Sequence, residues 1–159
     1  MRSLALILAL LPLPALAQCP PGGEIFSCPA GKKIIEVCTS NGVVTYSYGK
    51  PGKPDLTLSV PLQEADYTPW PGVGRSIWDA MAFHNNGFTY EVWASYDKLN
   101  ENALWEGGVN VLKGEAMQAQ ITCNKGSVTG DLSGLINAKE GVGLCWNFTT
   151  FAWQTAPCN

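Results

Sequence analysis

The sequence has few of the side chains on which several classes of protein depend. Only one of its 159 residues is a histidine, charged residues make up 14%, and the formal net charge is −3. No run of lysine or arginine exceeds two residues, so the basic face that nucleic acids require is missing. A zinc site needs several histidines or cysteines at close spacing, and the sequence has neither. We therefore expect no nucleic-acid partner, no metal and no cofactor.

Long apolar segments are absent as well, apart from a short one at the N-terminus. Residues 4–11 are apolar and follow a start with one basic residue. They precede Ala15-Leu16-Ala17, which has the small-x-small pattern cut by signal peptidase. The apolar run is much shorter than the roughly 20 residues that span a bilayer. We predict that residues 1–17 are a cleaved signal peptide and that the mature protein is periplasmic or secreted, with no membrane span.

Six cysteines follow the predicted signal peptide, and in an oxidising compartment an even number predicts disulfide bonds. They are Cys19, Cys28, Cys38, Cys123, Cys145 and Cys158. The sequence alone does not choose among the possible pairings. Spacing favours Cys145 with Cys158, Cys38 with Cys123, and Cys19 with Cys28. A lipid on Cys19 is the alternative to a soluble product, but lipoprotein signals need a small residue before the cysteine, and Gln18 is large.

Short runs of β-branched and aromatic residues alternate with turn residues along most of the chain. The runs predict strands at 33–38, 43–48, 56–60, 76–83, 88–96, 109–112 and 116–123. Asn41-Gly42 and Asn86-Gly87 predict two tight hairpins. Residues 18–32 and 61–76 are rich in proline and glycine, so we expect irregular structure there. Helices are predicted only at 132–140 and, more weakly, near 101–105.

This spacing of strands and turns predicts a mainly β protein, a small antiparallel barrel or sandwich stapled by disulfides. We assign residues 18–126 to that β domain. Residues 127–159, rich in tryptophan and cysteine, form an irregular C-terminal extension packed on the same domain.

Groups suited to catalysis are sparse. His84 is the sole histidine, it is predicted in a hairpin turn, and no serine lies in a G-x-S-x-G motif. Acid pairs drawn from Glu64, Asp66, Asp79 and Glu91 would suit a glycosidase, but thirteen acids make such pairs common by chance. We therefore expect no catalytic residue. A small hydrolase that uses His84 or an acid pair is kept as the third hypothesis.

The most distinctive segment is 68–76, with the sequence TPWPGVGRS. Proline limits its freedom, glycine permits tight turns, and tryptophan and arginine are the residues most enriched in interface hot spots. The only arginine after Arg2 lies here. We predict a loop that binds a protein partner through Trp70, Gly72, Gly74, Arg75 and Ser76. The alternative is that Trp70 folds onto the sheet and Arg75 pairs with a nearby acid such as Asp79.

Six tryptophans raise the possibility of glycan binding, because indole faces stack on sugars. Most are expected in the core of so small a sheet domain. Trp93 lies on the more polar face of its predicted strand, so we expect it to be the exposed tryptophan outside the loop. A carbohydrate-binding module is therefore the second hypothesis.

The order of features between Cys28 and Cys123 forms a wider pattern. A cysteine-bearing hairpin is followed by a leucine strand, a Gly/Arg loop, an aromatic hairpin and a final cysteine strand. The residues concerned are Cys28, Cys38, Tyr46, Leu56, Leu58, Phe88, Tyr90, Trp93 and Ile121-Thr122-Cys123. This region resembles the small periplasmic and membrane-anchored inhibitors of C-type lysozyme. The resemblance implies a compact antiparallel barrel in which an early cysteine is tied to one on the last strand.

The resemblance also implies a function. In those inhibitors a Ser-Gly-x-Arg-Tyr loop enters the lysozyme cleft and contacts its catalytic carboxylates, and the matching stretch here is 73–76. Gly74 and Arg75 match in type, whereas Ser76 follows the arginine instead of preceding the glycine. The first hypothesis is therefore a non-catalytic protein-binding module, an inhibitor of a cell-wall hydrolase or an immunity factor against a toxin of that class.

Overall fold

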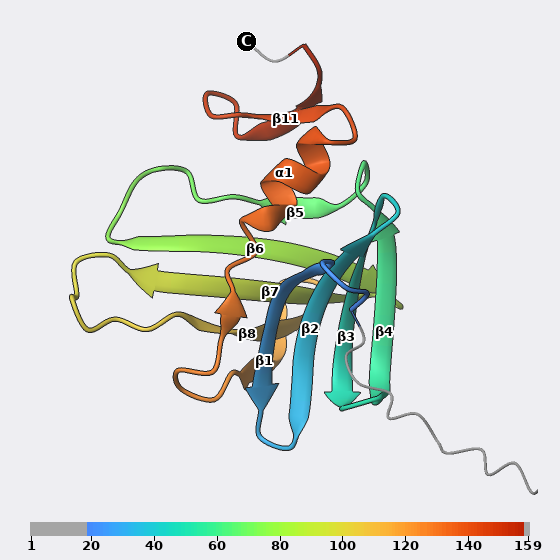
Figure 1. Ribbon diagram of the computed structural model, residues 1–159, viewed down its shortest axis with the longest axis vertical. Coiled ribbons are helices and arrows are strands. Elements are labelled where there is room, and N and C mark those ends of the chain that lie inside the picture. Colours follow the sequence, from blue (N-terminus) through green and yellow to red (C-terminus); the bar gives the residue numbers. More distant parts are fainter. Residues whose placement is uncertain (1–18, 158–159) are drawn as a thin grey trace, which may run out of the picture.

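The computed structural model describes residues 19–157 (Figure 1). The predicted signal peptide and Cys158 lie outside the described residues. No helix in the described part of the chain is both long and apolar enough to cross a membrane.

Two five-stranded antiparallel sheets make up most of the molecule. The first has the order β10 (Thr129–Gly130), β1 (Glu24–Ala30), β2 (Lys33–Ser40), β3 (Val43–Lys50) and β4 (Lys53–Pro61). The second has the order β5 (Asp66–Thr68), β6 (Ser76–Asn85), β7 (Phe88–Asp97), β8 (Glu106–Lys113) and β9 (Ala116–Thr122). The strands of the two sheets cross at a steep angle (Figure 1). The prediction of a mainly antiparallel β fold is confirmed, as a sandwich-like pair of sheets that does not close into a barrel.

The two predicted Asn-Gly hairpins are present. Asn41 and Gly42 have φ angles of 50° and 77°, and Asn86 and Gly87 have 51° and 78°. A two-residue turn of this kind needs a positive φ at both positions, which asparagine and glycine tolerate best. These turns set the β2–β3 and β6–β7 registers, such as Val37 opposite Tyr46.

Two segments predicted to be irregular contain strands. In residues 18–32, β1 pairs with β2 and buries Phe26 and Cys28. In residues 61–76, β5 pairs with β6 and buries Tyr67. Proline and glycine near both strands predict irregular structure. Each segment nevertheless forms a strand, because tertiary packing buries one of its apolar residues.

The C-terminal extension is more regular than expected. The predicted helix near 132–140 is present as α1 (Gly134–Glu140), whereas 101–105 contains turns and no helix. A further hairpin, which the sequence did not predict, joins β11 (Leu144–Asn147) to β12 (Ala152–Thr155). The extension therefore holds more regular structure than its sequence predicted, because a two-stranded ribbon of mixed polar and aromatic residues lacks a clear alternation.

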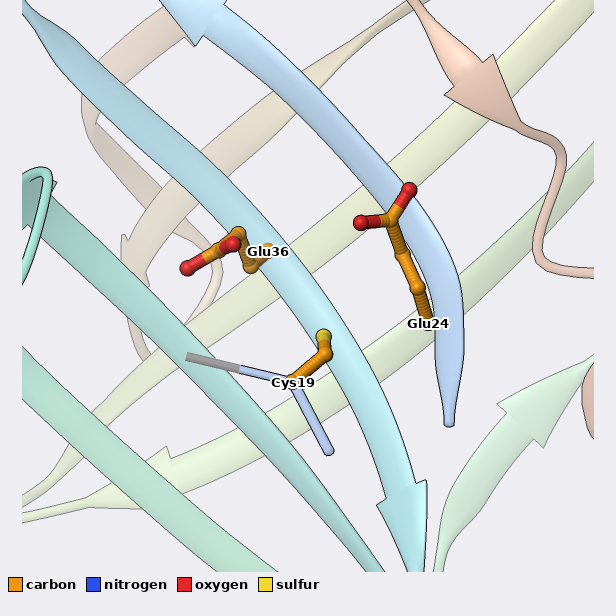
Figure 2. Close-up of side chains that lie close together, drawn as sticks. All are labelled: Cys19, Glu24 and Glu36. Carbon is orange, nitrogen blue, oxygen red and sulfur yellow. The ribbon is translucent and has the colours of Figure 1, made fainter. Parts of the chain in front are cut away.

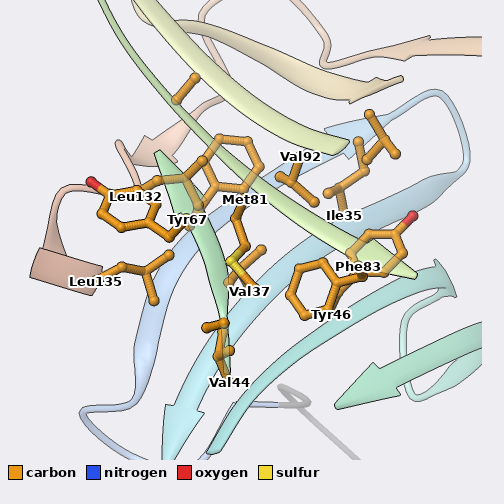
Figure 3. Packing of buried hydrophobic residues seen from close by; sticks show 14 of the residues in the cluster. Ile35, Val37, Val44, Tyr46, Tyr67, Met81, Phe83, Val92, Leu132 and Leu135 are labelled. Carbon is orange, nitrogen blue, oxygen red and sulfur yellow. The ribbon is translucent and has the colours of Figure 1, made fainter. Parts of the chain in front are cut away.

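One apolar cluster lies between the sheets (Figure 3). The first sheet contributes Val37 and Tyr46, and the second contributes Met81 and Phe83. The Tyr46 and Phe83 rings lie 5.5 Å apart, a separation typical of favourable aromatic pairs. Alternation along β7 is as predicted, with Val92 and Ala94 buried in this cluster. From the extension, Leu132 and Leu135 are fully buried in the same cluster.

The disulfides differ from the predicted pairs. The structure joins Cys19 to Cys38 and Cys28 to Cys123, so the Cys19–Cys28 and Cys38–Cys123 pairs were wrong. The reason is β1: as a strand it carries Cys28 into the core, next to Cys123, the residue that follows β9. Cys28–Cys123 therefore links the two sheets. Cys145 is also disulfide-bonded.

We expect the two described bridges to differ in their contribution to stability. Cys28 and Cys123 are 95 residues apart in the sequence, whereas Cys19 and Cys38 are 19 residues apart. A bridge that closes a longer loop restricts the unfolded chain more. Replacing Cys28 and Cys123 by serine should lower the free energy of unfolding by about 4.7 kcal/mol, against about 3 kcal/mol for Cys19 and Cys38. Urea unfolding of the two double variants measures both losses. The reverse order would contradict this account.

Candidate functional site

The predicted partner-binding segment forms an exposed connection between β5 and β6. We call residues 69–75 the proline loop. Gly72 and Gly74 have φ angles of 84° and 91°, and an added Cβ at either would meet nothing within 4 Å. Both glycines are therefore required by backbone conformation and not by space. Val73 between them is 68% exposed. The loop thus presents an apolar side chain at its tip.

Arg75 is held by Asp97, the last residue of β7, which lies opposite Ser76 in the β6–β7 register. Its Nε donates to both carboxylate oxygens of Asp97 at 2.9 Å, and its Nη2 donates to Oδ2 at 2.6 Å. This hydrogen-bonded pairing lowers the pKa of Asp97 below its usual value. The Arg75 side chain remains 66% exposed. The predicted alternative was right that Arg75 has a local acid, but wrong that Asp79 is that acid.

Trp70 stiffens the loop from inside. Its indole Nε1 donates to the Val73 carbonyl oxygen at 2.8 Å, and the Lys98 ammonium lies 4.6 Å from the ring centroid. The Trp70 side chain is half-buried, so only part of the ring faces solvent. Of the predicted site residues, Arg75 and the two glycines are exposed, whereas Trp70 and Ser76 are partly covered.

Sequence reasoning missed the group that fixes the base of this loop. Asp79 is buried on the core side of β6, and its Oδ1 accepts hydrogen bonds from the Tyr67 hydroxyl at 2.8 Å and the Trp70 backbone N–H at 3.2 Å. Burial raises the pKa of Asp79, although both hydrogen bonds act in the opposite direction. An acid on the apolar face of a strand is the signal that could have marked it.

The C-terminal extension holds the same region from the other side. Trp153 Nε1 donates to the Tyr67 carbonyl oxygen at 2.7 Å. The buried Lys139 ammonium donates to the carbonyl oxygens of Leu62 and Ala65 at 2.8 and 2.7 Å, and desolvation lowers its pKa. These bonds anchor the chain just before β5. The extension therefore supports the strand from which the proline loop departs.

Replacing Asp79 tests this support. Asp79→Ala leaves a buried hydroxyl and a backbone N–H without their acceptor, so it should lower the free energy of unfolding by about 1–3 kcal/mol. Asp79→Asn keeps an acceptor and should cost less.

The pH dependence of stability gives a further test. The folded-state pKa of Asp79 is raised above the ordinary 3.8, so the folded state binds this proton more tightly than the unfolded chain does. The free energy of unfolding of the wild type should therefore fall, relative to that of Asp79→Asn, as pH rises from 3.8 through the raised pKa. Urea titrations at several pH values measure this, and parallel profiles would contradict it.

The pairing of Arg75 with Asp97 gives a second prediction. In Arg75→Ala the Asp97 carboxyl loses its hydrogen-bonded cation, so its pKa should rise towards the ordinary 3.8. In the wild type, the stabilisation from this pair is present above 3.8 and is lost as pH falls through the lowered pKa. Carbon-detected NMR titration of Asp97 measures both values. An unchanged pKa in the variant would show that the contact does not persist in solution.

Of the candidate catalytic groups, Glu64, Asp66 and His84 lie together, whereas Asp79 and Glu91 lie elsewhere. His84 is paired with Thr89 near the end of β6, beside and not within the turn, and its Nδ1 lies 3.1 Å from Thr89 Oγ1. Its Nε2 lies 3.3 Å from Asp66 Oδ2, and both side chains are well exposed. Asp79 faces the core, while Glu91 accepts a hydrogen bond from Asn110 at 2.9 Å. Glu64, Asp66 and His84 line a shallow depression of about 350 Å³.

One group of side chains has the composition of a metal site. Ligand atoms of Cys19, Glu24 and Glu36 lie within 4.8 Å of one another (Figure 2). The Cys19 sulfur, however, is bonded to Cys38 and cannot act as a thiolate ligand. The cluster therefore does not supply the three ligands that its composition suggests.

The face of the second sheet that points away from the core carries two tryptophans, and we call it the outer face. Trp78 is 37% exposed, whereas Trp93 is half-buried and its indole nitrogen is covered, with no hydrogen-bond partner among the described residues. The expectation that Trp93 would be the exposed tryptophan was therefore wrong. Its neighbours across the strands are Ala80 and Gly108, whose small size leaves room for the indole to lie against the sheet.

A polar depression of about 330 Å³ lies at the end of the outer face nearest the proline loop. Its polar lining comes from β6, β7, the start of β8 and the loops beside them. These side chains include Ser76, Ser95, Asp97, Asn102, Glu106 and Lys125. Asp97 belongs both to this lining and to the pair with Arg75, so the proline loop and the polar depression adjoin.

No model of a known protein family matches the chain, and comparisons with curated proteins and with solved structures find no significant relative.

Proposed function

We propose that this chain is an exported, non-catalytic binding protein that presents the proline loop to a protein partner. The observation that carries the proposal is the two-point contact between Arg75 and Asp97, which holds an exposed guanidinium beside the exposed Val73. Arginine is one of the residue types most enriched in interface hot spots.

The loop is also ordered before it meets a partner. Two prolines, the Trp70–Val73 hydrogen bond and the buried Asp79 restrict it, so binding costs less conformational entropy than it would for a flexible segment. Asp97 occupies Nε and Nη2 of Arg75, which leaves the Nη1 donors for a carbonyl or carboxylate of the partner.

Export is part of the proposal. The described disulfides fit an oxidising compartment, and the predicted signal peptide would deliver the chain to the periplasm or beyond. The partner we propose is a cell-wall hydrolase of the C-type lysozyme class, or a toxin with that activity. The resemblance of the Cys28–Cys123 region supports this choice, and an acidic catalytic cleft would accept the Arg75 donors.

Inhibition of a C-type lysozyme tests the proposal directly. The wild-type protein should slow lysis of bacterial cell walls, and Val73→Asp and Arg75→Ala should each weaken binding by about 30-fold, the effect of losing a hot spot of about 2 kcal/mol. Lys113→Ala is the control, because Lys113 lies at the other end of β8 over Phe88. Lysozymes that stay fully active in excess wild-type protein would refute this function.

A further inference from the structure

The polar depression is not explained by a protein-binding loop. Its volume of about 330 Å³ falls at the lower end of the range for small-molecule sites, roughly 300–1,000 Å³. Several of its polar groups have no partner: the side chains of Ser76, Ser95, Asn102, Glu106 and Lys125 make no hydrogen bond or ion pair to the residues described. The depression thus offers hydroxyl, amide, carboxylate and ammonium groups together, at one place on the surface.

The charges around the polar depression balance. Asp97 is already paired with Arg75, and Glu106 and Lys125 are one acid and one base in the same lining. An anionic ligand would meet two carboxylates, and a cationic ligand would meet Lys125 and Arg75. A neutral ligand that both donates and accepts hydrogen bonds satisfies the lining best.

An aromatic surface adjoins these polar groups. In the β6–β7 register Trp78 lies opposite Ser95, and Ser76 lies opposite Asp97. Directly opposed residues point to the same face of a sheet, so the exposed Trp78 stands next to two side chains of the lining. Trp105 also lines the depression, and it packs on Tyr96 with ring centroids 5.5 Å apart. Exposed indole beside unpaired hydroxyl and amide groups matches a sugar ring, which has an apolar face and polar edges.

The loop that closes the polar depression is already formed. Asp97 Oδ1 accepts from the Leu99 N–H, Asn100 Oδ1 accepts from the Asn102 N–H, and the Asn100 carbonyl accepts from the Ala103 N–H. Successive turns of this kind fix the backbone that carries Asn102. A ligand would therefore meet a largely preformed site.

We propose that the polar depression and Trp78 together bind a neutral oligosaccharide. One sugar ring stacks on the Trp78 indole, and its neighbour enters the depression and forms hydrogen bonds with Ser95, Asn102 and Glu106. This site uses Trp78 in place of the Trp93 expected from the sequence. It does not rest on the proposed hydrolase partner, which would bind through Val73 and Arg75.

Isothermal titration with cellohexaose, chitohexaose, mannohexaose and xylohexaose tests the site. At least one should bind in the micromolar to millimolar range, and Trp78→Ala and Asn102→Ala should each lower its affinity by about tenfold. Phe148→Ala removes an exposed aromatic ring on the distant β11–β12 hairpin and should leave the affinity unchanged. Both site variants alter exposed side chains, and far-UV circular dichroism checks their folding.

The same variants separate this inference from the proposed function. Val73→Asp should weaken lysozyme inhibition by about 30-fold and leave sugar binding intact, whereas Trp78→Ala should lower sugar affinity by about tenfold and leave inhibition unchanged. Absence of binding to all four oligosaccharides at millimolar concentration would overturn the inference. Binding that both Trp78→Ala and Asn102→Ala leave unchanged would overturn it as well, because the sugar would then occupy another surface.

Discussion

The arrangement of the proline loop depends on one buried carboxylate. Asp79 is removed from water in the core side of β6, and a carboxylate there is tolerated only if hydrogen bonds replace its hydration. The Tyr67 hydroxyl and the Trp70 backbone N–H supply them. Both donors belong to the segment between β4 and β6, so satisfying Asp79 also fixes the path of that segment. The C-terminal extension completes this arrangement through Trp153, which binds the Tyr67 carbonyl oxygen.

Much of the fold could be predicted because local patterns and tertiary packing agree there. Residues 88–96 alternate in polarity and do form a strand with one buried face, and the Asn-Gly pairs turn where expected. The rest could not be predicted, because the deciding contacts are remote in sequence. β1 and β5 exist because Phe26 and Tyr67 are buried against other elements. The cysteine pairing followed β1, so missing that strand also gave the wrong bridges.

The candidate site shows the same division between local and remote information. The positive φ angles of Gly72 and Gly74 and the exposure of Arg75 follow from residue type, and sequence reasoning located that loop. The sequence did not predict that Arg75 pairs with Asp97, because the whole β6–β7 hairpin separates the two residues. Exposure of the tryptophans was misjudged for a related reason. The small residues on either side of Trp93 belong to other strands, and only the sheet register brings them to it.

Asp97 connects the two surfaces proposed for binding. It holds Arg75 on one side and lines the polar depression on the other, so a ligand that recruits its carboxylate changes what Arg75 can offer. Only a ligand that contacts the Asp97 carboxylate would couple the two sites energetically, and such a coupling acts equally in both directions.

The Cys28–Cys123 bridge sets an order in time. Cys28 lies in the first strand, and Cys123 directly follows the last strand of the second sheet. The N-terminal hairpins can therefore pair as soon as they are made, but the two sheets cannot be locked together until residue 123 is available. Until then Cys28 is without its native partner, which lies 95 residues further along the chain.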